Sequence, residues 1–329
     1  MKLLSDLIVP KVTQHPGRET ATMVFGLGAH KSGSTWLFDV LHPSRDVHAR
    51  CLVPGMPETV VKEAHYFDRH TKLGAHVVSL IQAEISGGAA RLADMEPGPE
   101  KTQVVELMRI GLDLLSIYAS PPGDHDAYLR WLCTGYAGQK VIADFTPSYA
   151  MLGAEVFAEM AAAWPRTRFI FIMRDPVDRL WSHARYDQRN KQMGDGDFDA
   201  AARAIFGRMV RRGVNDEAHR SNYVDTLTAL DKAVPSEDVL YLFYEDLFRP
   251  ETVQQVADFL GIHVDQPDFG RKSNEGREAD LPEDMQVAAA QMLAPQYEYV
   301  SARFGDAVPP RWRDRMALAG LDHPIERLA

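Results

Sequence analysis

Short, strongly apolar runs recur along the chain and alternate with longer stretches of helical periodicity. Such runs are typical of strands buried on both faces of a parallel sheet. They occupy residues 21–28, 141–143, 169–173 and 239–243. Apolar residues spaced three and four apart predict helices over residues 34–41, 151–164, 177–189, 223–233 and 251–260. Strands that alternate with helices predict a three-layer α/β fold, in which helices flank a central, mainly parallel sheet.

Three segments interrupt or end this pattern. The stretch at residues 87–99 contains glycine and proline, and residues 194–199 form an acidic turn, so both are predicted surface loops. Residues 283–304 have a helical pattern, but Pro295 is expected to kink or divide that helix. Neither loop has the length or composition of a linker between domains.

The 329-residue chain has the composition of an ordinary globular protein, with 45% hydrophobic and 25% charged residues. We expect residues 1–20 to be an N-terminal extension and residues 21–329 to form a single domain with insertions. No run of eighteen apolar residues occurs, so neither a signal peptide nor a transmembrane segment is expected. The two isolated cysteines, Cys51 and Cys133, favour a reducing compartment, and we expect a cytoplasmic protein.

The chain carries an acidic excess, with 36 Lys and Arg against 46 Asp and Glu and a formal net charge of −10. A general binder of nucleic acid or anionic membranes is therefore not expected. Residues 166–220 depart from this balance, because 12 Lys and Arg stand there against 8 Asp and Glu. An anionic ligand is expected to meet a local basic site in that part of the chain.

A glycine-bearing turn joins the first predicted strand to the first predicted helix. Such a turn aims backbone N–H groups and the positive end of a helix at one point, where Lys31 adds a full charge. This arrangement predicts phosphate binding; the alternative is a glycine-rich turn with a solvated lysine. His30 precedes Lys31, and the spacing from Gly26 is one residue too short for the nucleoside triphosphate loop. The turn is therefore a relative of that loop rather than a match to it.

A second polar cluster follows directly after the strand predicted at residues 169–173. Arg174 stands at the carboxyl edge of that strand, and Arg179 and Ser182 share one face of the helix that follows. A guanidinium and a hydroxyl at this edge predict a second phosphate contact, in which each charge-assisted hydrogen bond contributes about 1.5–3 kcal/mol. The alternative is a structural network in which the two arginines pair with Asp175 and Asp178.

In their order and separation, the two motifs resemble the cofactor signature of the sulfotransferases that use 3′-phosphoadenosine 5′-phosphosulfate (PAPS). The resemblance implies a P-loop-like fold, with Arg174 and Ser182 at the 3′-phosphate of the nucleotide. It assigns contacts with the cofactor in the first turn to Lys31, Ser32, Gly33, Ser34, Thr35 and Trp36. Residues 239–247 and 259–261 look like the later strand, Tyr-Glu-Asp-Leu turn and Phe-Leu-Gly helix end of that family, so the resemblance covers about residues 23–274.

A third segment, residues 62–68, reads Lys-Glu-Ala-His-Tyr-Phe-Asp. In an extended chain, Glu63 and His65 share one face, so a carboxylate and an imidazole can reach the same acceptor hydroxyl. The alternative is a solvated strand edge. The segment resembles the Lys-Glu-x-His-x-Phe-Asp pattern of glycosaminoglycan-type and related bacterial sulfotransferases. That resemblance implies that Glu63 is the general base, with His65 as the second candidate.

Two further motifs are less specific. Residues 146–149, Thr-Pro-Ser-Tyr, resemble the Thr-Pro-x-Tyr turn near the substrate cleft of the family, although an ordinary turn between a strand and a helix also explains them. Arg271 and Lys272 fall where relatives carry a basic loop over the 3′-phosphate. The alternative for these two cations is a solvated loop.

The resemblance implies an enzyme that moves the sulfuryl group of PAPS to a hydroxyl, or as a second choice an amine, of a small molecule, lipid or glycan. The expected product is adenosine 3′,5′-bisphosphate (PAP), and no metal is required. One alternative is a P-loop kinase in which Asp144 or Asp175 serves Mg²⁺. Another is a non-catalytic nucleotide-binding protein. The acidic remainder of the chain argues against a polyanionic acceptor, and the sequence leaves open whether the chain forms a homo-oligomer.

Overall fold

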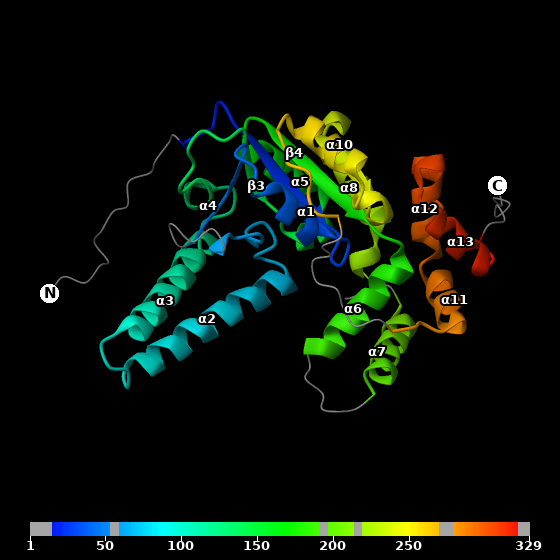
Figure 1. The fold of residues 1–329 in the computed structure, drawn as a ribbon, viewed down its shortest axis with the longest axis horizontal. Helices are drawn as coiled ribbons and strands as arrows, with labels where there is room; N and C mark the ends of the chain where they lie inside the picture. Colours follow the sequence, from blue (N-terminus) through cyan, green and yellow to red (C-terminus); the bar gives the residue numbers. More distant parts are fainter. Residues whose placement is uncertain (1–14, 53–58, 191–196, 214–218, 270–278, 322–329) are drawn as a thin grey trace.

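The computed structural model describes residues 15–52, 59–190, 197–213, 219–269 and 279–321. In these ranges a five-stranded sheet has the strand order β2-β3-β1-β4-β5, and all neighbouring strands are parallel (Figure 1). The strands are β1 (Thr22–Gly28), β2 (Val47–Ala49), β3 (Val141–Asp144), β4 (Thr167–Met173) and β5 (Val239–Phe243). The predicted α/β fold with a parallel sheet flanked by helices is confirmed.

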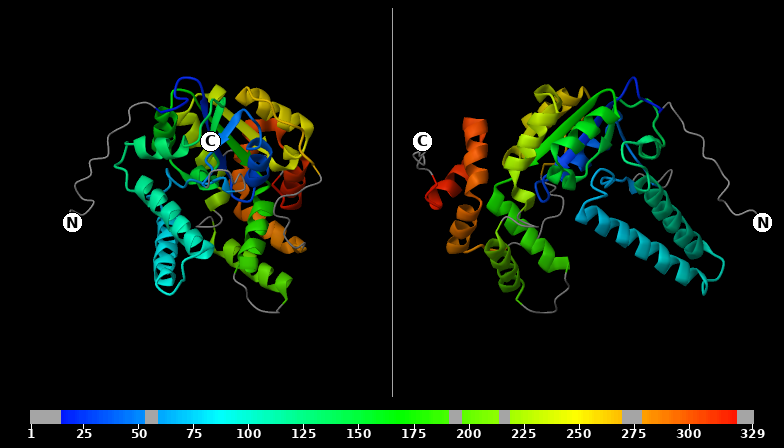
Figure 2. Two further views of the ribbon diagram at one scale, coloured as in Figure 1. Left: turned by 60° about the vertical axis from the view of Figure 1, so that its left-hand side comes forward. Right: turned by 180° about the vertical axis from the view of Figure 1, so that it is seen from behind.

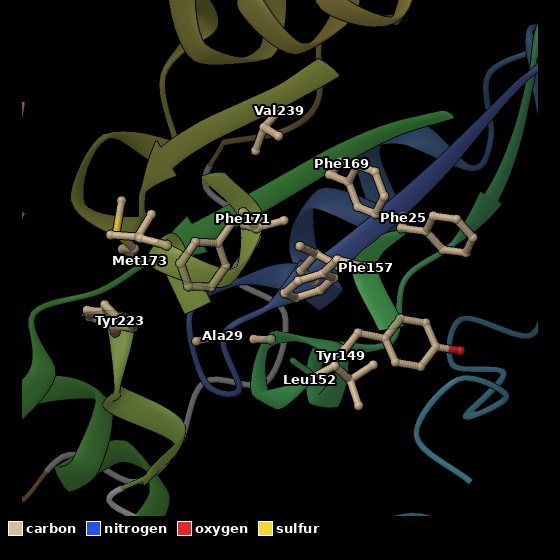
Figure 3. Close-up of a cluster of buried hydrophobic side chains, with 14 of the residues drawn as sticks. Phe25, Ala29, Tyr149, Leu152, Phe157, Phe169, Phe171, Met173, Tyr223 and Val239 are labelled. Carbon is tan, nitrogen blue, oxygen red and sulfur yellow. The ribbon is translucent and has the colours of Figure 1, made fainter. Parts of the chain in front are cut away.

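Both faces of the sheet are buried, because successive side chains of a strand point to opposite sides. In β4, Phe169, Phe171 and Met173 enter one apolar cluster, shown in Figure 3. Ile170 and Ile172 enter the cluster on the opposite face. The apolar run that predicted this strand therefore serves two cores at once.

The helices form a layer on each face of the sheet (Figures 1 and 2). The cluster around Ile170 is covered by α1 (Ser34–Leu41) and α10 (Pro250–Leu260). The cluster around Phe169 receives side chains from α4 (Asp126–Leu132), α5 (Ala154–Ala163), α6 (Pro176–Asn190), α7 (Phe198–Arg212) and α8 (Tyr223–Ala233). It also receives side chains from α11 (Glu283–Met292), α12 (Ala294–Phe304) and α13 (Pro310–Leu318). The short helix α9 (Tyr244–Leu247) follows β5 directly.

Two long helices, α2 (Lys72–Leu92) and α3 (Pro99–Tyr118), lie side by side and project from the sheet (Figures 1 and 2). The prediction of a surface loop over residues 87–99 is wrong for its first half, because α2 continues to residue 92. Gly88 is buried at the contact between these helices, where a Cβ atom would lie 2.9 Å from Met108 Cγ. Close helix packing thus overrides the low helix propensity of glycine.

The other sequence-based boundaries differ less. The helix predicted from residue 151 begins at Ala154, after a 3₁₀ turn over Pro147–Met151. Pro295 divides the C-terminal helical segment as expected, since α11 ends before it and α12 carries it in its first turn. In the acidic turn, residues 194–196 lie outside the described residues, and α7 begins at Phe198. Across the described ranges, no helix has both the length and the apolar character needed to cross a membrane.

Candidate active site

The turn between β1 and α1 has a backbone that requires glycine at two positions. Gly28 and Gly33 have φ angles of +97° and +85°, in the left-handed region that favours glycine. A Cβ atom on Gly28 would lie 2.6 Å from the carbonyl oxygen of Pro147, so a larger residue does not fit. Gly33 is the N-cap of α1, and the turn therefore leads Lys31 and Ser32 to the positive end of that helix.

Ser32 is positioned to donate a hydrogen bond inside this turn. The residue is 0% exposed, and among the described residues its Oγ has no hydrogen-bond partner. A buried hydroxyl that makes no hydrogen bond is unfavourable by about 1–3 kcal/mol. The hydroxyl, the helix end and the Lys31 side chain together fit an anionic group such as a phosphate.

The two predicted phosphate motifs adjoin in space. Arg174 Nη1 donates a hydrogen bond of 2.9 Å to the carbonyl oxygen of Lys31. Lys31 Nζ lies 4.3 Å from the centre of the Tyr186 ring on α6. Burial, followed by the charges of Arg189, Arg174 and Arg185, lowers the pKa of Lys31 to about 8. This crowding of cations favours a bound anion, because an anion would relieve their mutual repulsion.

The structural network proposed as the alternative for this segment is wrong in its pairings. Arg174 holds the turn, and its guanidinium lies 4.2 Å from the centre of the Tyr244 ring. Arg179 is fully buried, and its Nε donates a hydrogen bond to Ser221 Oγ. Asp178 pairs instead with arginines of α13, a helix that the sequence analysis did not predict. Arg174 therefore stays at the edge of the sheet beside the Lys31 turn.

The remaining predicted contacts with the nucleotide are more dispersed. Ser182 lies half-buried on α6, about 9 Å along the helix from its first residue. Trp36 is 4% exposed, and its ring centroid lies 4.8 Å from that of Phe248 and 6.2 Å from that of Phe269. Phe269 is followed by residues 270–278, which contain Arg271 and Lys272. Both of these predictions lie outside the described residues.

The segment over residues 62–68 contacts the phosphate turn through Lys62. Lys62 Nζ donates hydrogen bonds to Ser34 Oγ at 3.3 Å and to Glu63 Oε1 at 2.7 Å. His65 lies between two carboxylates, with Nε2 3.4 Å from Glu63 Oε2 and Nδ1 2.9 Å from Asp68 Oδ2. The side chains of Glu63 and His65 are 35% and 13% exposed, so this segment is no freely solvated strand edge. The carboxylate predicted to act as a base thus lies beside the turn predicted to bind phosphate.

The charges of this cluster are fixed by its contacts. Burial would raise the pKa of Glu63, but hydrogen bonds and charges from His65 and Lys62 outweigh it and lower that pKa to about 2. Burial would lower the pKa of His65, but Asp68 and Glu63 raise it to about 10. At neutral pH the cluster therefore contains an ionised carboxylate and an imidazolium whose two N–H groups point at carboxylates.

A buried carboxylate on β3 holds this segment in place. Asp144 is 1% exposed and accepts hydrogen bonds from the hydroxyls of Tyr128, Tyr149 and Thr146. Thr146 Oγ1 in turn accepts the N–H of Ala64 at 3.0 Å. The Thr-Pro-Ser-Tyr motif therefore supports residues 62–68. The sequence analysis missed this role, since nothing in the sequence spacing connects these distant positions.

Backbone strain occurs both in the Lys31 turn and in the segment over residues 62–68. Of the residues that the structure describes, two besides glycine have a positive φ: Lys31 at 66° and His65 at 51°. Residues other than glycine rarely adopt this backbone conformation, and it persists where surrounding contacts impose it. Strained residues gather at active and binding sites. The backbone thus marks the same two positions that the motifs predicted.

We expect His65 to remain protonated between about pH 6 and pH 9, because its pKa of about 10 in the folded protein lies above that range. The folded-state pKa is above the unfolded value, so the stability that this contact contributes is complete below pH 6.5 and is lost as the pH rises toward 10. An NMR titration of the His65 ring protons checks this, with the signal assigned by its loss in His65→Gln. An inflection near pH 6.5 would contradict it, whereas Asp68→Asn should move the titration to lower pH.

The chain matches a known protein family in sequence and solved structures in fold. The sequence model described as "Sulfotransferase family" matches residues 23–266 of the chain. Among solved structures, a sulfotransferase from Alicyclobacillus acidocaldarius superposes with a TM-score of 0.56 at 19% identity, over 88% of this chain and 98% of that one. A sulfotransferase domain from the curacin biosynthetic pathway has a TM-score of 0.41 at 16% identity, over 92% of this chain and 99% of that one.

No curated protein matches the chain in sequence. The family match nevertheless spans most of the chain, including the Lys31 turn, the Glu63 segment and Arg174. The Alicyclobacillus structure adds an independent likeness in fold. The chain belongs to the sulfotransferase family.

Proposed function

We propose that the protein transfers the sulfuryl group of PAPS to an acceptor hydroxyl and releases PAP. The observation that carries this proposal is the convergence of three motifs on one site. Arg174 donates to the Lys31 carbonyl, and Lys62 bridges Ser34 of the turn and Glu63. One site thereby offers cations to the anionic ends of the nucleotide and a carboxylate to the acceptor.

The nucleotide would be held by groups from both phosphate motifs. Lys31, Ser32 and the backbone at Gly33–Thr35 would contact the 5′-phosphosulfate, with Ser34 close to the Lys62 ammonium. Arg174 and Ser182 would contact the 3′-phosphate, and Trp36, which is 4% exposed, is proposed as a further contact with the nucleotide. Arg271 and Lys272 are proposed as further contacts with the 3′-phosphate.

The bound donor supplies an activated sulfuryl group, whose bond to the 5′-phosphate oxygen breaks as the acceptor oxygen bonds to sulfur. Lys31 and the N–H groups of its turn would stabilise the charge that develops on the departing phosphate oxygen. We also propose that residues 21–329 form a single domain and that residues 1–20 are an N-terminal extension.

Glu63 is the better candidate for the general base. Its low pKa keeps it ionised at neutral pH, so it can accept the proton of the acceptor hydroxyl. His65 carries a proton on each ring nitrogen at that pH, and it would have to lose one before it could act as a base. His65 instead stabilises the charge of Glu63 and fixes the orientation of that carboxylate.

The net negative charge of the chain argues against a polyanionic acceptor. The chain has an acidic excess of ten, and its basic residues concentrate in residues 166–220, the segment that carries Arg174 and Ser182. A polyanionic acceptor would be repelled by the remaining surface. We therefore propose a small molecule, a lipid or an uncharged glycan that presents a hydroxyl.

The kinase alternative receives no support from the geometry. It requires Asp144 or Asp175 to be available to Mg²⁺ at the edge of the sheet. Asp144 accepts hydrogen bonds from three side-chain hydroxyls, and Asp175 accepts one from a tyrosine hydroxyl and one from a backbone N–H. The oxygens of both carboxylates therefore already accept hydrogen bonds within the protein, where a kinase would need them as ligands of Mg²⁺.

We expect calorimetric titration to give tighter binding of PAP without metal than of adenosine triphosphate with Mg²⁺. The reason is that Lys31 is proposed to bind the 5′-phosphate of PAP and Arg174 its 3′-phosphate, so each cation meets a separate anionic group of the nucleotide. Transfer of ³⁵S from labelled PAPS to a panel of hydroxyl compounds then tests catalysis. Tighter binding of the triphosphate would contradict the proposal. Tight binding of PAP without transfer to any acceptor would favour the non-catalytic alternative.

A further inference from the structure

The C-terminal helices α11–α13 pack against the segment that carries Arg174. The family match ends at residue 266, and α11 begins at Glu283, so these helices lie outside the matched part of the chain. In Figures 1 and 2 they stand together beside α6 and α8. Two sets of contacts connect them to the turn that follows β4.

The first set holds the backbone of Arg174. The Arg174 N–H donates to Tyr223 Oη at 3.2 Å, and the Tyr223 hydroxyl donates to the Arg174 carbonyl at 2.7 Å. The Tyr223 ring stacks on Trp312 of α13, with ring centroids 5.9 Å apart. Trp312 is fully buried and also packs against Tyr297 and Phe243. Helix α13 thus supports a side chain whose hydroxyl binds both the N–H and the carbonyl of Arg174.

The second set holds the next residue, Asp175, which is fully buried. The hydroxyl of Tyr297, on α12, donates to Asp175 Oδ2 at 2.8 Å. Arg315 is 4% exposed; its Nη2 lies 2.7 Å from Asp178 Oδ1, and its Nε lies 3.8 Å from Asp175 Oδ1. One guanidinium therefore contacts two carboxylates, one just before α6 and one in its first turn. Arg311 also pairs with Asp178, so loss of Arg315 would chiefly affect the buried Asp175, and an uncompensated buried charge favours rearrangement of the turn.

The Arg174 guanidinium itself makes two contacts, a hydrogen bond to the Lys31 carbonyl and a cation–π contact with Tyr244, and neither is an ion pair. Its position therefore depends on how firmly its backbone is held. Two restraints on that backbone come through Tyr223 and Asp175, both of which contact the C-terminal helices, and a third comes from Glu245 of α9, whose Oε1 accepts the Asp175 N–H at 2.9 Å. Loosening those helices would shift the guanidinium and weaken its bond to the Lys31 carbonyl. The Lys31 turn would keep two further contacts, the Ala29 N–H donating to the Ile172 carbonyl at 2.8 Å and Lys62 Nζ donating to Ser34 Oγ at 3.3 Å.

We propose that the C-terminal segment α11–α13 positions Arg174 for the 3′-phosphate of the nucleotide, with Tyr297 and Arg315 as positioning residues. The proposal rests on the proposed function, in which Arg174 contacts that phosphate. By linkage, a nucleotide that engages Arg174 stabilises the docked C-terminal helices in return. A nucleotide without a 3′-phosphate does not.

The test compares PAP with adenosine 5′-monophosphate, which lacks the 3′-phosphate, in Tyr297→Phe and Arg315→Met. Each variant is expected to bind PAP about tenfold more weakly, within the usual range of coupling between sites, and to bind the monophosphate as the wild type does. Arg313→Met, an exposed arginine on the same helix, is the control and should change neither affinity. In an Arg174→Met background, the second substitution should add little further loss.

Several results would overturn the proposal. One is unchanged affinity for PAP in the folded variants; another is an equal loss for both nucleotides, which indicates a general structural role. If neither variant folds, hydrogen exchange of the wild type decides: PAP should slow exchange over residues 310–318 more than the monophosphate does, and equal slowing would contradict the proposal. A wild type that binds both nucleotides equally would instead overturn the assignment of Arg174, and this proposal with it.

Discussion

Replacing Glu63 by glutamine is expected to lower turnover by about 10²–10⁴-fold, the usual contribution of a positioned general base. The amide has nearly the shape of the carboxylate but cannot take up the proton of the acceptor hydroxyl. The affinity for PAP should remain nearly unchanged, because Glu63 is assigned to the acceptor rather than to the nucleotide. Turnover is measured by transfer of ³⁵S from PAPS, and affinity by calorimetry with PAP.

The chain offers a closely matched control for this substitution. Glu159 has the same exposed fraction as Glu63, 35%, and lies at the same distance from a histidine, 3.4 Å from His125 Nε2. It lies on α5, and its ion pair with His125 involves no residue of the Lys31 turn. Glu159→Gln should leave turnover intact. Unchanged turnover in Glu63→Gln would remove Glu63 from the role of base and direct attention to His65.

Much of the fold followed from the sequence, because a strand buried on both faces must be apolar at every position. The run over residues 169–173 met this condition and proved to be the last five of the seven residues of β4. β2 has three residues, too few for a pattern to stand out, and it was not predicted. Helix α2 was not predicted either, and its last turns fell in a predicted loop, since Gly88 is favoured by its contact with Met108 of α3 rather than by local propensity.

The candidate site divides in the same way. Lys31, Glu63 and Arg174 stand in local motifs, so the chemistry of each was visible in the sequence. The groups that hold them are not local: Asp144 supports residues 62–68 from β3, and Tyr297 reaches Asp175 from α12. Hydrogen bonds between residues 80 or 122 positions apart leave no periodic trace in the sequence. Local motifs therefore identify candidate site residues, and tertiary contacts decide where those residues lie.

Replacing Lys31 by alanine is expected to lower turnover by about 10²–10³-fold, as the loss of one group that stabilises developing charge does. Unlike Glu63→Gln, it should also weaken the binding of PAP, because the ammonium faces the 5′ end of the nucleotide in the ground state as well. Burial, followed by the charges of the surrounding cations, lowers the pKa of Lys31 to about 8 in the free protein. The charged form attracts the anion, so the wild-type affinity for PAP should be highest below pH 8 and should decline as the pH rises above that value. Binding should be accompanied by uptake of protons near pH 8.

Lys31→Arg is the matched variant, because it keeps the charge and removes the titration. It should bind PAP with an affinity that varies little between about pH 7 and pH 9, since an arginine side chain stays protonated over that range. Its turnover is expected to lie between those of the wild type and Lys31→Ala, because the guanidinium does not reproduce the compact ammonium. Calorimetry in buffers of different ionisation enthalpy measures the proton uptake. Equal pH dependence of binding in the wild type and Lys31→Ala would show that another group carries the titration, and it would remove Lys31 from the proposed nucleotide contact.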